Sequence, residues 1–195
     1  MLFTVQPVCA QYFPYTFQTW DANNGLSSNY CNTILQGANG YLYVGTNNGL
    51  YVFNGSNFKN AAHQAASELI SEGNVEDVVT DAYNRIWFAS IEHGVGLIDL
   101  KERKIRIQYF VPPPADSFPN PQILNNSRVS KLCFDSKGNL WVGTRGNGLF
   151  TFDTLTKKFM YVPVENSTAT YNKHIRSLFL YKPDTLFVGL INGLS

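Results

Sequence analysis

The sequence predicts an all-β fold, a β-propeller built from four-stranded antiparallel blades. The main observation is a five-residue segment that recurs four times: an aliphatic, an aromatic, an apolar, a small and then usually a hydroxyl residue. The copies span residues 42–46, 86–90, 140–144 and 186–190. They begin 44, 54 and 46 residues apart. Repeats of about 40 to 50 residues are typical of propeller blades.

An earlier strand is predicted ahead of each repeat segment, because apolar residues recur eight and eleven positions before it. These residues are Ile34, Val78, Leu132 and Leu178 at the shorter spacing, and Cys31, Val75, Val129 and Ile175 at the longer one. Short turns follow at 37–40, 81–84, 135–138 and 181–184, and the first three end in Gly or Asn. Both residues tolerate positive φ, so we expect tight hairpins.

Two further strands complete each blade. A Gly-Leu pair opens a third strand after each repeat segment, at 49–50, 96–97, 148–149 and 193–194. Fourth strands are expected at 57–59, 104–111 and 158–164. Neighbouring residues of a strand point to opposite faces, so a segment such as 140–144 makes a sheet apolar on both sides. Such a sheet must be covered on both sides, and we therefore expect Trp87 and Trp141 to wedge between blades.

The repeat spacing sets the domain organisation. Within a propeller region at 12–195, blades are expected near residues 30–60, 75–111, 129–164 and 175–195. Residues 15–20 alternate in aromatic character and are predicted to form a strand that closes the last blade. Since the sequence ends inside the third strand of the fourth blade, we expect an incomplete or open propeller. Residues 1–11 resemble either a secretory signal that lacks its front or a disordered tail.

Composition excludes several classes of function. Only 15% of the residues are charged and the formal net charge is +1, so neither nucleic acid nor an anionic membrane is an expected partner. The three cysteines lack metal-ligand spacing, and no apolar run is long enough to span a bilayer. We therefore expect no metal and no cofactor, and any link to a membrane would run through segments downstream of this chain.

The repeat resembles a known family. The Asp-x-x-Gly-Asn turn at 135–139, the Leu-Trp-Val-Gly-Thr segment at 140–144 and the Gly-Leu-Phe-x-Phe-Asp strand at 148–153 are similar to the two-component regulator propeller repeat. The Gly-Leu-Ser-Ser-Asn stretch at 25–29 is similar to the family's entry segment. The resemblance implies a fragment of the periplasmic input region of a hybrid two-component histidine kinase. It implies an oligosaccharide ligand released from a polysaccharide, a homodimer, and no enzymatic activity in this chain.

Candidate ligand-binding residues lie in the loops that join second to third strands, because these loops emerge on one face of a propeller. They are rich in amides, with one acid and one guanidinium, which suits sugar hydroxyls or the carboxylate of an acidic sugar. The candidates are Asn47, Asn48, Glu92, His93, Arg145, Asn147 and Asn192.

No residue is assigned a catalytic role. The acid and imidazole at positions 92 and 93 are adjacent, and adjacent side chains of an extended strand point to opposite faces. Two alternatives remain open at this stage. One is a propeller-type carbohydrate lyase or hydrolase, and the other is a secreted protein-binding scaffold.

Overall fold

The strands of the protein form four antiparallel sheets. The computed structural model describes residues 16–23, 25–64, 73–99, 106–111, 128–164, 174–191 and 193–194. Within these residues three sheets have four strands and one has three. In every sheet the strands pair in chain order, so each sheet is a series of consecutive hairpins.

The sheets are called blades 1 to 4 in chain order. Blade 1 contains β1 (Cys31–Gln36), β2 (Leu42–Thr46), β3 (Gly49–Phe53) and β4 (Phe58–Asn60). Blade 2 contains β5 (Val75–Thr80), β6 (Ile86–Ser90), β7 (Gly94–Asp99) and β8 (Arg106–Phe110). Blade 3 contains β9 (Val129–Phe134), β10 (Leu140–Thr144), β11 (Leu149–Asp153) and β12 (Lys158–Val162). Blade 4 contains β13 (Ile175–Lys182), β14 (Thr185–Leu190) and β15 (Gly193–Leu194). One helical turn, α1 (Ala61–Gln64), follows β4.

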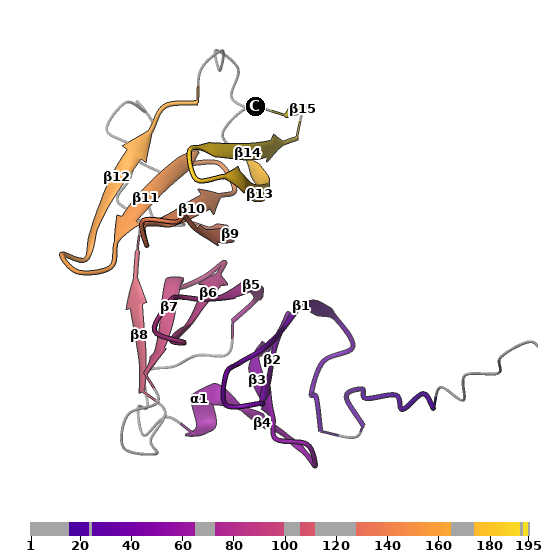
Figure 1. Ribbon diagram of the computed structural model, residues 1–195. Coiled ribbons are helices and arrows are strands. Elements are labelled where there is room, and N and C mark those ends of the chain that lie inside the picture. The colour runs from indigo at the N-terminus through magenta and orange to yellow at the C-terminus, as the bar shows by residue number, and fades with distance from the viewer. Residues whose placement is uncertain are drawn as a thin grey trace, which may run out of the picture.

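The four blades fan out side by side in an open arc (Figure 1). The first strands lie along the inside of the arc, where β1 contacts β5, β5 contacts β9 and β9 contacts β13. Strands β8 and β12 lie on the outside. The predicted all-β fold, an incomplete propeller of antiparallel blades, is confirmed.

Apolar side chains between consecutive blades form the core. In β6, Ile86 and Phe88 pack with residues of blade 1, whereas the fully buried Trp87 packs against blade 3. Trp141 of β10 packs in the same way against Ile175 of blade 4. The prediction that these aromatic residues wedge between blades is confirmed.

A turn carboxylate holds the indole of each wedge tryptophan. Asp81 Oδ2 accepts a hydrogen bond from Trp87 Nε1 at 3.0 Å, and Asp135 Oδ2 accepts one from Trp141 Nε1 at 3.2 Å. Each carboxylate also accepts two backbone N–H groups of its own turn. One aspartate therefore fixes the hairpin and satisfies an indole donor at a blade interface.

The other two blades replace this pair with pairs of their own. Blade 1 has Gly37 in place of the aspartate, and the Tyr43 hydroxyl accepts a hydrogen bond from Asn39 Nδ2 at 3.1 Å. A Cβ at position 37 would lie 2.7 Å from Tyr43 Cε2, so this pairing requires glycine. Blade 4 pairs Tyr181 with Phe187, with ring centroids 5.9 Å apart. The turn residue and the wedge residue thus differ together from blade to blade.

The hairpin turns have the backbone geometry that the sequence predicts. Gly40, Asn84 and Gly138 have φ of 80°, 60° and 84°, and each donates its N–H to the carbonyl three residues earlier. The fourth turn is tighter, since Lys182 pairs directly with Thr185.

The segment ahead of β1 covers the face of blade 1 that points away from blade 2. Trp20 packs edge-on against Phe53 and Phe58, with ring centroids 5.3 Å from each. Leu26 is buried in a cluster with Val44. This segment therefore shields one end of the arc.

Two predictions about the N-terminus involve residues beyond this segment. Residues 1–11, predicted as a signal or a tail, lie outside the described residues. The closing strand predicted at 15–20 begins outside them, and residues 16–20 belong to no strand. Its closure of a last blade stays a prediction.

We expect Gly143→Ala to destabilise the contact between blades 3 and 4. A Cβ at Gly143 would lie 2.6 Å from Ile175 Cγ2, so we predict a loss of about 1–3 kcal/mol in the free energy of unfolding. Urea unfolding measures it. The same change in an Ile175→Ala background should cost less, because Cγ2 is gone. An equal cost in both backgrounds would contradict the close approach.

The turn carboxylates are also a source of acid sensitivity. Burial opposes ionisation of Asp81, but hydrogen bonds from Trp87 and Arg85 outweigh it and lower its pKa. The pKa of Asp135 is lowered in the same way, mainly by Asn139, against the opposing effect of burial. A pKa that is lower in the folded than in the unfolded chain gives stability that is complete above the unfolded value of about 3.9 and is lost as the pH falls through the folded value.

We therefore predict that the double variant Asp81→Asn, Asp135→Asn loses less stability on acidification than the wild type. Unfolding free energies between about pH 5 and pH 2 test this, since that range brackets the carboxylate titration. The control is Asp184→Asn, in the exposed turn of blade 4, where the structure shows no hydrogen bond to the carboxylate. If the free energy of unfolding falls equally steeply with decreasing pH in the double variant and in the wild type, the role of the turn carboxylates is contradicted.

Candidate functional site

The loops between second and third strands lie at the same end of all four blades as the starts of the first strands. In each blade, the first residue of the first strand pairs with the last residue of the second strand. We call this end the loop face. It comprises residues 30–32, 46–49, 74–76, 90–94, 128–130, 144–148 and 174–176.

The hydroxyl at the end of the repeat segment fixes the loop that follows. Thr46 Oγ1 accepts a hydrogen bond from the backbone N–H of Asn48 at 3.0 Å and donates to the carbonyl of Gly49 at 2.9 Å. Thr144 Oγ1 accepts from the N–H of Asn147, also at 3.0 Å. The hydroxyl in the repeat is therefore a capping residue for the loop backbone.

A hydrogen-bond network crosses the loop face from blade 1 to blade 3, with Asn74 at its centre. Asn74 Oδ1 accepts from Asn32 Nδ2 at 2.9 Å, and Asn74 Nδ2 donates to Glu76 Oε1 at 3.1 Å. The backbone N–H of Asn74 donates to Glu92 Oε2 at 2.7 Å.

Two further side chains form the ends of this network. In blade 1, Asn32 Nδ2 also lies 3.1 Å from Asn47 Oδ1 and 3.0 Å from the Val75 carbonyl, so its two hydrogens are shared among three acceptors. In blade 3, Arg145 Nη2 donates to Glu76 Oε2 at 2.6 Å. The loop-face network therefore consists of Asn32, Asn47, Asn74, Glu76, Glu92 and Arg145.

In blades 1 to 3, the residue ten positions before the repeat segment reaches the next blade. Asn32 donates to the carbonyl of Val75, and Ser130 Oγ donates to the carbonyl of Ile175 at 2.9 Å. Glu76 holds this position in blade 2, where an ionised carboxylate has no hydrogen to donate. Glu76 instead accepts a hydrogen bond from the Arg145 guanidinium of blade 3, so this position joins blades 2 and 3 through an ion pair.

A second carboxylate joins blades 2 and 3 beside the network. Asp77 Oδ2 accepts from the backbone N–H of Leu132 at 3.1 Å and lies 3.8 Å from Lys131 Nζ. Burial raises the pKa of Asp77, while the Lys131 charge and the Leu132 hydrogen bond oppose that rise.

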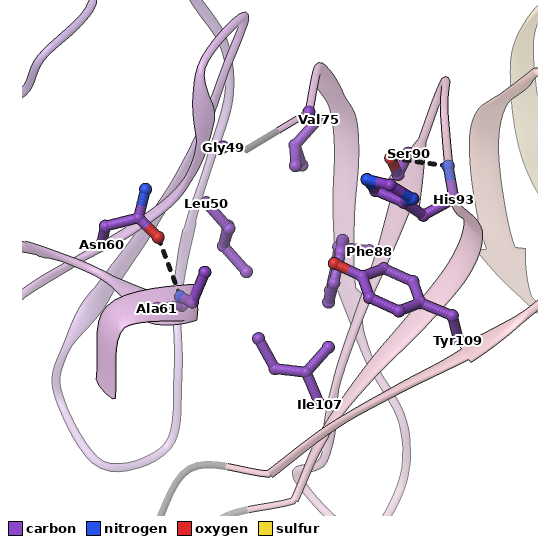
Figure 2. A pocket seen from close by; sticks show the side chains of 12 residues that line it. Gly49, Leu50, Asn60, Ala61, Val75, Phe88, Ser90, His93, Ile107 and Tyr109 are labelled. Atoms are coloured by element: carbon purple, nitrogen blue, oxygen red, sulfur yellow. Dashed lines mark hydrogen bonds between the residues drawn. The ribbon is translucent and has the colours of Figure 1, made fainter. Parts of the chain in front are cut away.

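A small pocket lies between blades 1 and 2 next to the loop face (Figure 2). His93 and Tyr109 line it with ring centroids 5.0 Å apart, and burial raises the pKa of Tyr109 to about 12, so its phenol stays protonated. Asn60 Nδ2 is buried in its wall with no hydrogen-bond acceptor among the described residues. The cavity volume of about 20 Å³ admits one water molecule and excludes a sugar ring.

The structure separates the seven predicted site residues into groups. Asn47, Glu92 and Arg145 belong to the network. The remaining four are placed differently. Asn48 and the buried Asn147 sit in capped loops, His93 lines the pocket, and Asn192 lies outside the described residues.

Sequence reasoning missed Asn32, Asn74 and Glu76, which connect the predicted residues. Their signal was available: each is a polar residue ten or twelve positions before a repeat segment, at or just before the start of a first strand. The described part of the chain contains no cluster of three or more His, Cys, Asp or Glu suited to a metal ion. None of its helices is long and apolar enough to cross a membrane.

We predict that Asn74→Ala loosens the loop face, because it removes the contact with Asn32 between blades 1 and 2 and leaves Glu76 short of one hydrogen bond. The expected cost is about 1–2 kcal/mol in the free energy of unfolding. Amide hydrogen exchange should also become faster in the loops that hold Asn47 and Arg145.

The matched control for this change is Asn48→Ala, on the same face, where the structure shows no side-chain hydrogen bond. It should leave stability and loop exchange close to wild type. Equal effects of the two substitutions would contradict the role given to Asn74.

Sequence comparison places two parts of the chain in one family. Residues 25–48 and 123–146 match the two component regulator propeller model. These stretches contain β1 with β2 and β9 with β10, the two inner hairpins of blades 1 and 3. A search of curated proteins gave no match.

Solved structures share the fold over most of this chain. The extracellular domain of BT3049 from B. thetaiotaomicron, assigned to a hybrid two component system, is 25% identical with a TM-score of 0.71, over 93% of this chain and 25% of that one. The extracellular domain of BT4673 from the same organism is 20% identical with a TM-score of 0.67, over 90% and 22%. PorZ, a surface component of the type-IX secretion system of Porphyromonas gingivalis, is 20% identical with a TM-score of 0.61, over 86% and 26%.

The chain spans about a quarter of the length of each of these structures. The two chains with lower identity show the fold alone. The family match falls on the hairpins that carry the repeat segment, and the same hairpin recurs in all four blades. The inner hairpins of blades 1 and 3 therefore match the two component regulator propeller model.

Proposed function

We propose that this chain is part of the extracytoplasmic input region of a two-component sensor and that it binds oligosaccharides derived from a polysaccharide. The observation that carries this proposal is the likeness of 93% of the chain, at 25% identity, to an extracellular domain assigned to a hybrid two component system. The match to the regulator propeller family supports it from the sequence side. In this proposal the chain lies in the periplasm.

The loop face is the surface that we assign to the ligand. Its network joins amides, carboxylates and a guanidinium from three blades, which are the groups that bind sugar hydroxyls. The capping hydroxyls of Thr46 and Thr144 hold the loop backbones in place. A surface held in this way loses little conformational entropy when a ligand binds.

The structural contacts of Glu92 and His93 support binding of the ligand without its cleavage. Glu92 accepts the backbone N–H of Asn74, and His93 lies against Tyr109 in the pocket wall. Each side chain is used in a contact that joins parts of the fold. We therefore assign neither a catalytic role.

The output of the sensor belongs to other parts of the parent protein. We propose that this parent is a histidine kinase and that the input region passes on the signal as a homodimer.

We predict that the chain binds an oligosaccharide and leaves it intact. Titration of the ¹⁵N-labelled chain with a panel of neutral and acidic oligosaccharides should shift amide resonances near Asn47, Glu92 and Asn147, while chromatography shows no cleavage. Cleavage of any panel member would contradict the proposal and favour a lyase or hydrolase. No shift with any saccharide, together with capture of a defined protein partner, would contradict it in favour of a scaffold.

A further inference from the structure

Basic side chains gather on the loop face where blade 3 meets blade 4. Arg145 forms a β-bridge with His174, and its backbone N–H donates to the carbonyl of Arg128 at 2.8 Å. Arg176 follows His174 by two residues, at the irregularity in β13 between Ile175 and Ser177, and its charge acts on the His174 imidazole, so the two side chains lie near each other. We call Arg128, Arg145, His174 and Arg176 the basic cluster.

The positive charge of this cluster is only partly balanced. Within the described residues, the carboxylate that pairs with it is Glu76, which binds Arg145. Arg128 and Arg176 are exposed, and the structure shows no acidic partner for either. The whole chain has a net charge of only +1, so the excess positive charge is a local property of this surface.

The cluster also has more hydrogen-bond donors than acceptors. Arg145 Nε is buried with no acceptor among the described residues. Burial lowers the pKa of His174, and the charges of Arg176 and Arg145 lower it further, so the imidazole is neutral at pH 7. Its side chain lies close to the loop, since a Cβ at Gly146 would be 3.8 Å from His174 Nε2.

We infer that the basic cluster binds the carboxylate of an acidic oligosaccharide. Guanidinium groups bind planar carboxylates through paired N–H donors. Arg145 uses one Nη2 hydrogen bond for Glu76, and its Nε has no acceptor among the described residues. Arg176 offers a guanidinium for which the described residues provide no carboxylate partner. The amides of the network in blades 1 and 2 then face the neutral hydroxyls of the same ligand. This inference rests on the proposed function, because it names the charge of the ligand that the loop face takes.

The test is calorimetric titration of the 195-residue chain with trigalacturonic acid and with neutral galactotriose. We expect the acidic sugar to bind more tightly, with an affinity that falls as salt is added. Arg176→Gln should weaken this binding about tenfold or more, as expected for loss of a hydrogen bond between charged groups. Because the Arg176 side chain is exposed, this variant should fold normally.

The matched control is Lys182→Gln, which removes one positive charge from the other end of the same strand. It should leave the affinity within about twofold, because the local contact is kept while the net charge falls equally. Equal losses in the two variants, or equal affinity for both sugars, overturn the carboxylate site and leave oligosaccharide sensing standing. If neither sugar binds while another member of the oligosaccharide panel does, the carboxylate site alone is overturned. If no member of the panel binds, the proposed function is overturned as well.

Discussion

The fold depends on one constraint: its sheets are apolar on both faces and must be buried between neighbours. Trp87 packs towards the next blade, while Ile86 and Phe88 on the same strand pack towards the previous one. A sheet of this kind has no face to present to water, so the blades stack side by side. Stacking brings the first strands together inside the arc and sets the loops between second and third strands at one end.

The polar chemistry of the loop face follows from this packing. Because first strands of consecutive blades are in contact, a side chain near the start of one strand reaches the backbone of the next, as Asn32 and Ser130 do. Blade 2 has Glu76 at this position, and its carboxylate draws Arg145 across from blade 3. The same position in the repeat thus makes a neutral hydrogen bond between blades 1 and 2 and between blades 3 and 4, and an ion pair between blades 2 and 3. The resulting face is acidic near blade 2 and basic where blade 3 meets blade 4.

The sequence was a good guide wherever structure is set locally. Positive φ at Gly40 and Asn84 and the wedge position of Trp87 follow from turn chemistry and strand alternation within one repeat. The network was not predictable in this way, because Asn32 and Asn74 are 42 residues apart and meet only when two blades pack. The loop candidates were placed on the correct face by topology, but their partners lie at or just before the starts of first strands, which loop-based reasoning does not examine.

Residue-resolved amide hydrogen exchange of the wild-type chain tests most directly whether blade packing builds a fixed loop face. The backbone N–H of Asn74 bonds to Glu92, and that of Asn48 bonds to Thr46, so both lie in loops yet have defined acceptors. The account predicts that these amides are protected nearly as strongly as those of the central strands β6 and β10. Exchange at the rate of an unprotected loop, while the strands remain protected, would contradict it.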